Sequence, residues 1–375
     1  MIQRLLNNNL EKRWNKGKAI IILGPRQVGK TTLIRNFIED KKNVLWLNAD
    51  NQDVQTLFEN PNTAKFKKEF SSYDAVVIDE AQRIKDIGIK LKLITDEIKE
   101  VQLLVTGSSA FELSNEVNEP LTGRKWEFQL FPLSFEEMKN HHGLLEEKRL
   151  LNHRLIYGYY PDVVNANGDE KEILRQLTDS YLYKDLLIWN RIKKNDKLVK
   201  LLQALAFQLG NQVSYNELGN LVGLDNETIE NYLQLLEYAF VIFRLGSFRR
   251  NLRTELKKSR KIYFYDNGVR NALIANFKSI ELRQDTGALW ENFLISERMK
   301  TNAYHRKWAN NYFWRTKTQQ EVDYIEESDG ELNAYEFKWN PKHKARITKT
   351  FSNAYPDAKG HIINQENYLD FITKD

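Results

Sequence analysis

The first 140 residues alternate short apolar runs with amphipathic stretches. The apolar runs cover residues 19–23, 44–47, 75–78, 103–105 and 126–131. Between them, residues 31–39, 63–70 and 89–99 carry apolar side chains at spacings of three and four, as one face of a helix requires. Short buried strands that alternate with helices are typical of a parallel sheet covered by helices. The pattern therefore predicts an α/β domain over residues 1–140.

The pattern changes twice in the rest of the chain. Helical spacing dominates after the first domain, most clearly at residues 174–189 and 198–209. Strand-like runs return at residues 262–265, 312–315, 322–325 and 334–337. We therefore predict three parts, which are an α/β domain at residues 1–140, a helical region at residues 141–260 and a second α/β domain at residues 261–375.

A helix-turn-helix pattern lies within the helical region. Residues 213–219 open a helix, Gly223 marks a turn, and Asp225 or Asn226 caps a second helix that runs to Tyr238. A strand-like run at residues 240–245 follows. This order is similar to a winged helix-turn-helix.

The second of these helices is acidic, which argues against base reading. It contains Glu227, Glu230 and Glu237 and no lysine or arginine. Phosphate repulsion opposes insertion of such a face into a DNA groove. The apolar stripe of the helix, formed by Ile229, Tyr232, Leu233 and Leu236, is typical of a core face.

Composition and charge narrow the setting. Of 375 residues, 41% are apolar and 29% are charged, which is the profile of a soluble globular protein. The chain has no cysteine, so disulfides and thiolate metal sites are excluded. No apolar run approaches the roughly 20 residues that cross a bilayer, and residues 1–19 lack the features of a signal peptide. We expect a cytoplasmic protein without a membrane partner, and its net charge of +5 permits a nucleic-acid partner.

A phosphate-binding loop follows the first apolar run. Residues 24–31, GPRQVGKT, match the pattern G-x-x-x-x-G-K-[ST] between a predicted strand and a predicted helix. Backbone N–H groups and the helix N-terminus favour phosphate there, Lys30 adds a charge for the terminal phosphates, and Thr31 offers a hydroxyl to Mg²⁺. We expect ATP with Mg²⁺ to bind Gly24, Pro25, Arg26, Gln27, Val28, Gly29, Lys30, Thr31 and Thr32.

An acid pair at the end of another buried strand complements this loop. Residues 75–80, AVVIDE, place Asp79 at the carboxyl end of a strand, where it can hold Mg²⁺ through water. Glu80 can then orient or deprotonate the attacking water. Taken alone, such a pair is usually a helix cap, but beside a phosphate loop it predicts a hydrolysis site.

Two weaker candidates complete the predicted ATPase site. Ser108 or Ser109, after the strand at residues 103–105, is placed to sense the γ-phosphate, and a polar turn that caps a helix at Ala110 is the alternative. Arg124 is a candidate arginine finger, acting in cis or from a neighbouring subunit, and a surface arginine is the alternative.

These motifs resemble those of a known family. The sequence VIDEAQR at residues 77–83, TGSSA at 106–110 and GR at 123–124 are similar to a prokaryotic branch of AAA-like ATPases. In that branch the ATPase is fused to a C-terminal domain of unknown function, and the resemblance covers nearly the whole chain. It supports the winged helix and implies a homo-oligomer, since many AAA-like ATPases form rings. The DEAQ sequence also resembles helicases, but the chain has no second motor domain.

A basic segment follows the helix-turn-helix. Arg244, Arg249, Arg250, Arg253, Lys257, Lys258, Arg260 and Lys261 stand against a single acid, Glu255. A loop this basic is suited to grip the phosphates of double-stranded DNA without sequence preference. A solvated charge run is the alternative.

The C-terminal strands carry a third constellation. Glu336 and Lys338 share one face of a strand, and a turn at residues 328–330 brings Asp323 near them. Glu291, from the helix at residues 287–300, precedes them. Two carboxylates and a lysine suit Mg²⁺ binding and water activation for phosphodiester cleavage.

This constellation resembles the D…E-x-K core of restriction-endonuclease-like folds. The resemblance implies Glu291, Asp323 and Glu336 as metal ligands and Glu336 and Lys338 as catalytic residues. The alternative is a salt-bridged strand pair on a fold that has lost catalysis.

Two functions fit these features. One is an ATPase whose hydrolysis regulates action on DNA, including metal-dependent cleavage. The other is a nucleotide-driven switch that binds a protein partner through a catalytically silent, nuclease-like docking domain.

Overall fold

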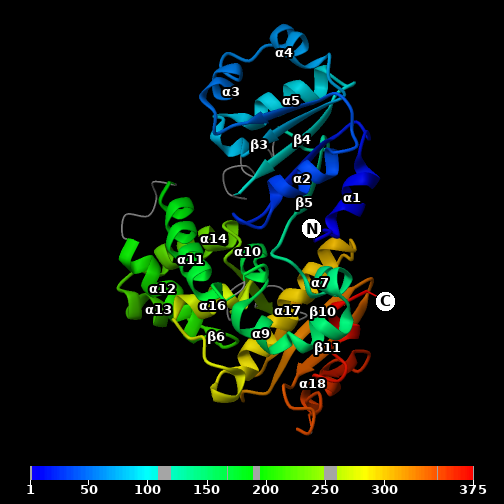
Figure 1. Cartoon of the computed structure of the whole chain (residues 1–375). Coiled ribbons are helices and arrows are strands. Elements are labelled where there is room, and N and C mark those ends of the chain that lie inside the picture. The colour runs from blue at the N-terminus through cyan, green and yellow to red at the C-terminus, as the bar shows by residue number, and fades with distance from the viewer. Residues whose placement is uncertain are drawn as a thin grey trace. The chain divides into compact units, whose positions relative to one another are not determined.

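The computed structural model describes residues 2–108, 120–166, 168–188, 195–248, 260–343 and 345–374. The chain divides into two compact units (Figure 1). The first unit ends at Pro132, and the second comprises Leu133–Glu237 and Val241–Asp375. The first unit ends close to the predicted boundary at residue 140, whereas residue 260 lies inside the second unit.

The first unit is built on a five-stranded parallel sheet with the order β2-β3-β4-β1-β5. Its strands are β1 (Ala19–Leu23), β2 (Val44–Asn48), β3 (Ala75–Asp79), β4 (Gln102–Gly107) and β5 (Lys125–Gln129). Every residue of β1, β3 and β4 is buried. A parallel sheet covered on both faces requires such continuous apolar strands, so the predicted α/β fold of this unit is confirmed.

The helices described in the first unit precede β1 or connect its parallel strands. They are α1 (Leu6–Arg13), α2 (Lys30–Ile38), α3 (Gln52–Leu57), α4 (Thr63–Phe70) and α5 (Ile87–Glu97), with a short 3-10 turn, η1 (Ala81–Arg83). In α4, Asn62 caps the first turn by accepting a hydrogen bond from the Lys65 N–H. Phe66 and Phe70 are fully buried from the same helix and stack with ring centroids 5.4 Å apart. The apolar spacing that predicted this helix therefore marks the face that it packs into the core.

The second unit contains a seven-stranded mixed sheet with the order β12-β11-β10-β9-β7-β8-β6. Its strands are β6 (Gln212–Val213), β7 (Ile242–Ser247), β8 (Arg260–Phe264), β9 (Asn310–Arg315), β10 (Glu321–Ser328), β11 (Glu331–Phe337) and β12 (Lys359–Ile363). Strand β7 pairs in parallel with β9, so Gly246 lies opposite Tyr312. The predicted boundary at residue 260 thus coincides with the first residue of β8 and falls within one continuous sheet. Local periodicity does not report this pairing, because it joins residues far apart in sequence.

The helix-turn-helix pattern forms as two helices, α13 (Tyr215–Val222) and α14 (Asn226–Tyr238). Gly223 ends α13 in a left-handed conformation with φ of 68°. The predicted stripe of α14 is buried, which confirms that this face belongs to the core. The hairpin of β7 and β8 follows. The winged-helix assignment of this arrangement stays a prediction.

The described part of the second unit contains further helices (Figure 1). They are α7 (Phe135–His142), α8 (Leu144–Arg149), α9 (Leu151–Tyr157), α10 (Pro161–Val164), α11 (Glu170–Ile188), α12 (Asn195–Phe207), α16 (Asn267–Leu273), α17 (Thr286–Tyr304), α18 (Lys349–Ala354) and α19 (Leu369–Ile372), with a 3-10 turn, η2 (Ile280–Leu282). No helix in the described part of the chain is long and apolar enough to cross a membrane.

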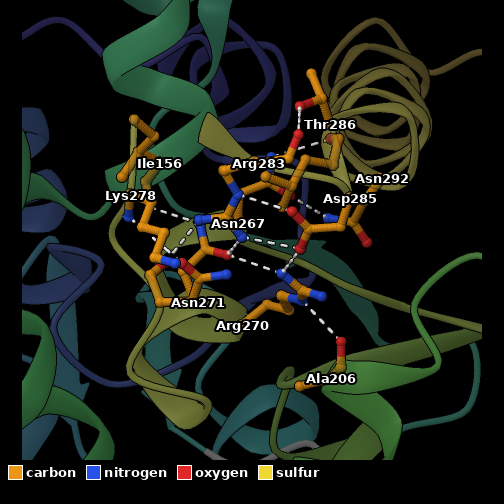
Figure 2. A network of polar contacts seen from close by, with 12 residues as sticks. Ile156, Ala206, Asn267, Arg270, Asn271, Lys278, Arg283, Asp285, Thr286 and Asn292 are labelled. Carbon is orange, nitrogen blue, oxygen red and sulfur yellow. Dashed lines mark hydrogen bonds and ion pairs between the residues drawn. The ribbon is translucent and has the colours of Figure 1, made fainter. Parts of the chain in front are cut away.

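A buried polar network joins several of these helices (Figure 2). Arg270 and Arg283 both donate to the Asp285 carboxylate, at distances from 2.6 to 2.9 Å. Asn271, which is fully buried, donates to the Ile156 carbonyl at 2.8 Å. Each of these polar groups has a hydrogen-bond partner on a neighbouring element. The network therefore holds α9, α16 and the start of α17 together.

Glu326 forms a second buried ionic centre, on β10. Its side chain is fully buried and accepts two hydrogen bonds of 2.8 Å from Arg298. It also accepts a 2.9 Å bond from Asn302 and contacts Lys307. Burial alone raises the pKa of Glu326, but the hydrogen bonds from these partners outweigh it and lower the pKa to about 2.

We predict that Glu326→Gln destabilises the second unit by about 3–5 kcal/mol, because it leaves the buried Arg298 without its counter-charge. Calorimetry at pH 7 measures this loss, and Glu327→Gln, at the next and less buried position, is the matched control. The pKa of Glu326 lies below its ordinary value of 4.5. The ionised Glu326 therefore contributes its full stabilisation of the fold above pH 4.5, and this stabilisation is lost as the pH falls through about 2. Equal unfolding temperatures for the two variants would contradict this role.

Candidate nucleotide-binding site

The phosphate-binding loop lies between the end of β1 at Leu23 and the start of α2 at Lys30. A Cβ atom at Gly24 would lie 2.2 Å from the Leu130 carbonyl oxygen, so no side chain fits there. Gly29 has φ of 88°, a left-handed conformation that favours glycine, at the position before α2. The two glycines therefore hold the loop beside the helix N-terminus, where backbone N–H groups and the helix dipole favour an anion.

The Lys30 side chain reaches back into the phosphate-binding loop that precedes α2. Its side chain is 5% exposed, and its Nζ donates to the carbonyl oxygens of Gly24 and Pro25 at 2.9 Å each. The ammonium is thus held at the centre of the predicted phosphate site by backbone groups of the loop itself.

Thr31, in the first turn of α2, and Asp79, the last residue of β3, meet beside this loop. The Thr31 hydroxyl donates to Asp79 Oδ2 at 2.9 Å. Thr106, at the end of β4, donates to Asp79 Oδ1 at 2.5 Å. Asp79 is 4% exposed, so these two hydroxyls hold a largely desolvated carboxylate in place. Hydroxyl and carboxylate oxygens are hard ligands that Mg²⁺ prefers, so these residues fit the ion that accompanies ATP.

Gln82 joins Glu80 and Ser108 through hydrogen bonds, although its place in the sequence at residues 77–83 predicted no role for it. The Gln82 amide donates to Glu80 Oε2 at 2.6 Å and to the Ser108 hydroxyl at 2.9 Å. Glu80 adopts a left-handed backbone with φ of 56°, which costs a non-glycine residue on the order of 1 kcal/mol and is often found at functional sites. Its N–H donates to the Thr106 hydroxyl at 2.9 Å. Ser109 lies outside the described residues.

Arg4 is a further member of the site that has no sequence signature. Its guanidinium donates to the carbonyl of Val28 at 2.7 Å and to the carbonyl of Phe131 at 2.6 Å. The residue is 8% exposed. It therefore ties the phosphate-binding loop to the chain just after β5, and it lies ahead of α1 at the start of the sequence.

Arg124 lies at the other edge of the parallel sheet. Its carbonyl accepts from the N–H of Ala19, the first residue of β1, whereas the phosphate loop follows the last residue of β1. At about 3.3 Å per residue, the length of β1 separates these ends by roughly 13 Å. The Arg124 side chain pairs with Asp96 at 2.5 Å. In this structure the Arg124 side chain therefore pairs away from the phosphate loop, and its role as an arginine finger, in cis or from a neighbouring subunit, stays a prediction.

The four residues of the C-terminal constellation do lie near one another in the second unit. Lys338 donates to Glu336 at 2.7 Å, and Asp323 accepts from the Phe337 N–H at 2.8 Å. Burial, together with the charges of Glu291 and Glu336, raises the pKa of Asp323 well above its ordinary value. However, no group of three or more His, Asp or Glu side chains among the described residues has the geometry to hold a metal ion.

The basic segment is partly committed to internal contacts. Arg244 donates to Glu230 at 2.6 Å and to the Tyr215 hydroxyl at 3.0 Å, and it also pairs with Glu237. Lys261 is 1% exposed. Arg244 and Lys261, at the two ends of the predicted phosphate-gripping segment, are therefore both paired with carboxylates of the protein, and DNA binding by the segment stays a prediction. Arg249, Arg250, Arg253, Lys257 and Lys258 lie outside the described residues.

Three families match successive parts of the chain. Residues 16–139 match an AAA domain family. Residues 148–280 and residues 286–374 match two domains of unknown function, DUF8612 and DUF4143. The match of residues 286–374 agrees with the expected fusion of an ATPase to a C-terminal domain of unknown function.

Several relatives match this chain over different lengths. An uncharacterized protein of Methanocaldococcus jannaschii is 24% identical over 96% of this chain and 84% of its own length. One of Haemophilus influenzae is 28% identical over 68% of each chain. An uncharacterized ATP-binding protein of M. jannaschii is 57% identical over 35 residues, which are 9% of this chain and 59% of that protein.

A solved structure has a related fold. A Walker-type ATPase of Pyrococcus abyssi superposes with a TM-score of 0.50 at 15% identity, over 73% of this chain and 96% of its own. Residues 16–139 thus match the AAA domain family, and they carry the phosphate loop and the Thr31–Asp79 contact on a parallel-sheet fold like that of P-loop ATPases.

Proposed function

We propose that the first unit binds ATP with Mg²⁺ and hydrolyses its terminal phosphate bond. The observation that carries this proposal is the chain of hydrogen bonds from Thr31 through Asp79 to Thr106, beside the buried Lys30. These contacts bring a hydroxyl–carboxylate pair and a buried ammonium together at the carboxyl ends of the parallel strands, where nucleotide sites of α/β proteins form, and this supports the proposal.

Nucleotide binding exchanges internal partners for phosphate. Lys30 now donates to the Gly24 and Pro25 carbonyls, and phosphate oxygens are stronger acceptors for an ammonium because they are charged. The N–H groups of the loop and of the first turn of α2 complete the cradle. Thr31 and, through water, Asp79 would hold Mg²⁺, which supplies positive charge to the terminal phosphates when bound.

Glu80 is the proposed base that orients the attacking water and takes its proton. Gln82 holds the Glu80 carboxylate and the Ser108 hydroxyl at the same time, so both are positioned before substrate arrives. Ser108 is placed to accept or donate a hydrogen bond to the γ-phosphate. The Thr106 hydroxyl joins the two acids, because it donates to Asp79 and accepts from the Glu80 N–H.

We infer for the second unit a nucleotide-controlled docking surface for a protein partner. This inference is supported by the acidic α14 and by the internal pairing of Arg244 and Lys261. The competing proposal is action on double-stranded DNA, with cleavage by Asp323, Glu336 and Lys338.

We predict that Lys30→Ala and Glu80→Gln separate binding from hydrolysis. Lys30→Ala removes the phosphate contact, so ATP binding falls by about 10-fold or more, as expected for the loss of a charge-assisted bond. Glu80→Gln keeps binding, but kcat drops by roughly 10²–10⁴-fold, because a general base is lost. Calorimetric titration and phosphate release measure the two effects, with Lys42→Ala, an exposed lysine after α2, as the control. Unchanged turnover in Lys30→Ala would refute the site.

We predict that Arg4→Met raises KM for ATP more than it lowers kcat. The loss of two charge-assisted bonds to the Val28 and Phe131 carbonyls loosens the loop but removes no group that touches the reacting atoms. Arg4→Lys, which keeps the charge, restores part of the affinity. Lys12→Met, an exposed position in α1, controls for charge alone. A fall in kcat at constant KM would assign Arg4 a different role.

We predict for the second unit neither salt-dependent DNA binding nor nicking of plasmid DNA. Fluorescence anisotropy with duplex DNA at about 50 mM salt, where phosphate contacts are strongest, tests the first point. Plasmid nicking with Mg²⁺ or Mn²⁺, with and without ATP, tests the second. Binding that weakens as salt is added, or nicking that disappears in Lys338→Ala, would favour the competing DNA proposal.

A further inference from the structure

Lys261 lies at the centre of the C-terminal carboxylates, although no motif marks it. It belongs to β8, where it lies opposite Leu245 of β7 and Gln212 of β6. Its Nζ lies 3.0 Å from Glu291 Oε1 of α17 and also contacts Glu321 of β10. With 1% of its side chain exposed, this ammonium is enclosed by three separate elements of the second unit.

The carboxylates around Lys261 already have donors from the protein. Glu291 Oε1 accepts from the Tyr263 hydroxyl at 2.5 Å as well as from Lys261. Glu321 also pairs with Arg315 at 3.4 Å. Asp323 and Glu336 accept from the Phe337 N–H and from Lys338, as described above. Each of these carboxylates therefore already has a donor from the protein on at least one oxygen.

The charges of the cluster nearly balance. Four carboxylates, Glu291, Glu321, Asp323 and Glu336, face three cations, Lys261, Arg315 and Lys338. One negative charge is in excess, and Lys261 is the cation of the cluster that is enclosed most completely, since 1% of its side chain is exposed.

A divalent ion does not fit beside this ammonium. Mg²⁺ requires oxygens at about 2.0–2.1 Å in near-octahedral geometry, and it keeps a shell of water. It would add two positive charges to a cluster that Lys261 and its neighbours already neutralise. Expelling Lys261 would in turn break its ion pairs with Glu291 and Glu321, and breaking a buried ion pair is strongly destabilising because it leaves a charge without its partner.

We propose that the Lys261 ammonium is the resident cation of this cluster, in the place where a metal-dependent nuclease would hold a divalent ion, and that the cluster binds such an ion only when the ammonium is removed. The proposal concerns the second unit and does not rest on ATP hydrolysis. It explains how the residues of a D…E-x-K core are retained for stability without a metal.

The test is a titration of the full-length, nucleotide-free chain with Mn²⁺ alone, followed by the paramagnetic resonance of free Mn²⁺. Every sample carries Asp79→Asn, so the first unit contributes no cation site. We expect no tight site while Lys261 is intact. In Lys261→Met we expect one Mn²⁺ per chain, bound at least about 10-fold more tightly, because two or more carboxylates lose their counter-charge. Glu336→Gln added to Lys261→Met should abolish the gained site.

Lys307→Met is the matched control, because it removes an ammonium from the separate buried carboxylate Glu326. It should gain no Mn²⁺ site.

One result overturns the proposal without any Lys261 variant. In that result, the chain with Lys261 intact binds Mn²⁺, and Glu336→Gln abolishes this binding. The proposal is also overturned by a folded Lys261→Met chain with no gain. If that variant fails to fold, Lys261→Gln, which keeps a hydrogen-bond donor, replaces it. ATP turnover of the Asp79-intact chain is measured in parallel and reports on the ATPase proposal separately.

Discussion

Buried charged groups need partners, and this constraint shapes both units of the protein. In the first unit, Asp79 is held by the hydroxyls of Thr31 and Thr106, and Lys30 by carbonyls of its own loop. In the second unit, Lys261 is enclosed by Glu291 and Glu321. The two groups of contacts differ in the strength of the partners.

The partners in the first unit are weak and exchangeable. In the proposed complex, a charged phosphate oxygen would replace the neutral carbonyls that accept from Lys30, and the Thr31 hydroxyl would exchange a hydrogen bond for a metal contact. The partners of Lys261 are full carboxylates in a buried setting, so the gain from exchanging them is small and the cost is large. A site poised to bind ligand therefore lies in one unit, and a self-neutralised cluster of similar residue types lies in the other.

Sheet topology determines which side chains reach each site. In the parallel sheet, the carboxyl ends of β1, β3 and β4 lie at one edge, so the phosphate loop, Asp79 and Ser108 converge there. Arg124 precedes β5 and is carried to the opposite edge. In the second unit, the parallel pairing of β7 with β9 joins the hairpin after the helix-turn-helix to the strands of the D…E-x-K residues. This pairing carries Lys261 of β8 into the second unit's acidic cluster.

The sequence by itself determined the features that depend on neighbouring residues. The strands at residues 19–23 and 75–79, the phosphate loop and the Asp79-Glu80 pair were predicted, because apolar runs, glycines and strand-end acids act locally. Only the tertiary structure decided the roles of Arg4, Gln82 and Lys261 and the position of Arg124. Each of these depends on contacts between residues distant in sequence, such as Arg4 with Phe131 or Lys261 with Glu291. A sequence shows which residues are lysine or arginine, but the fold determines which group neutralises the charge of each.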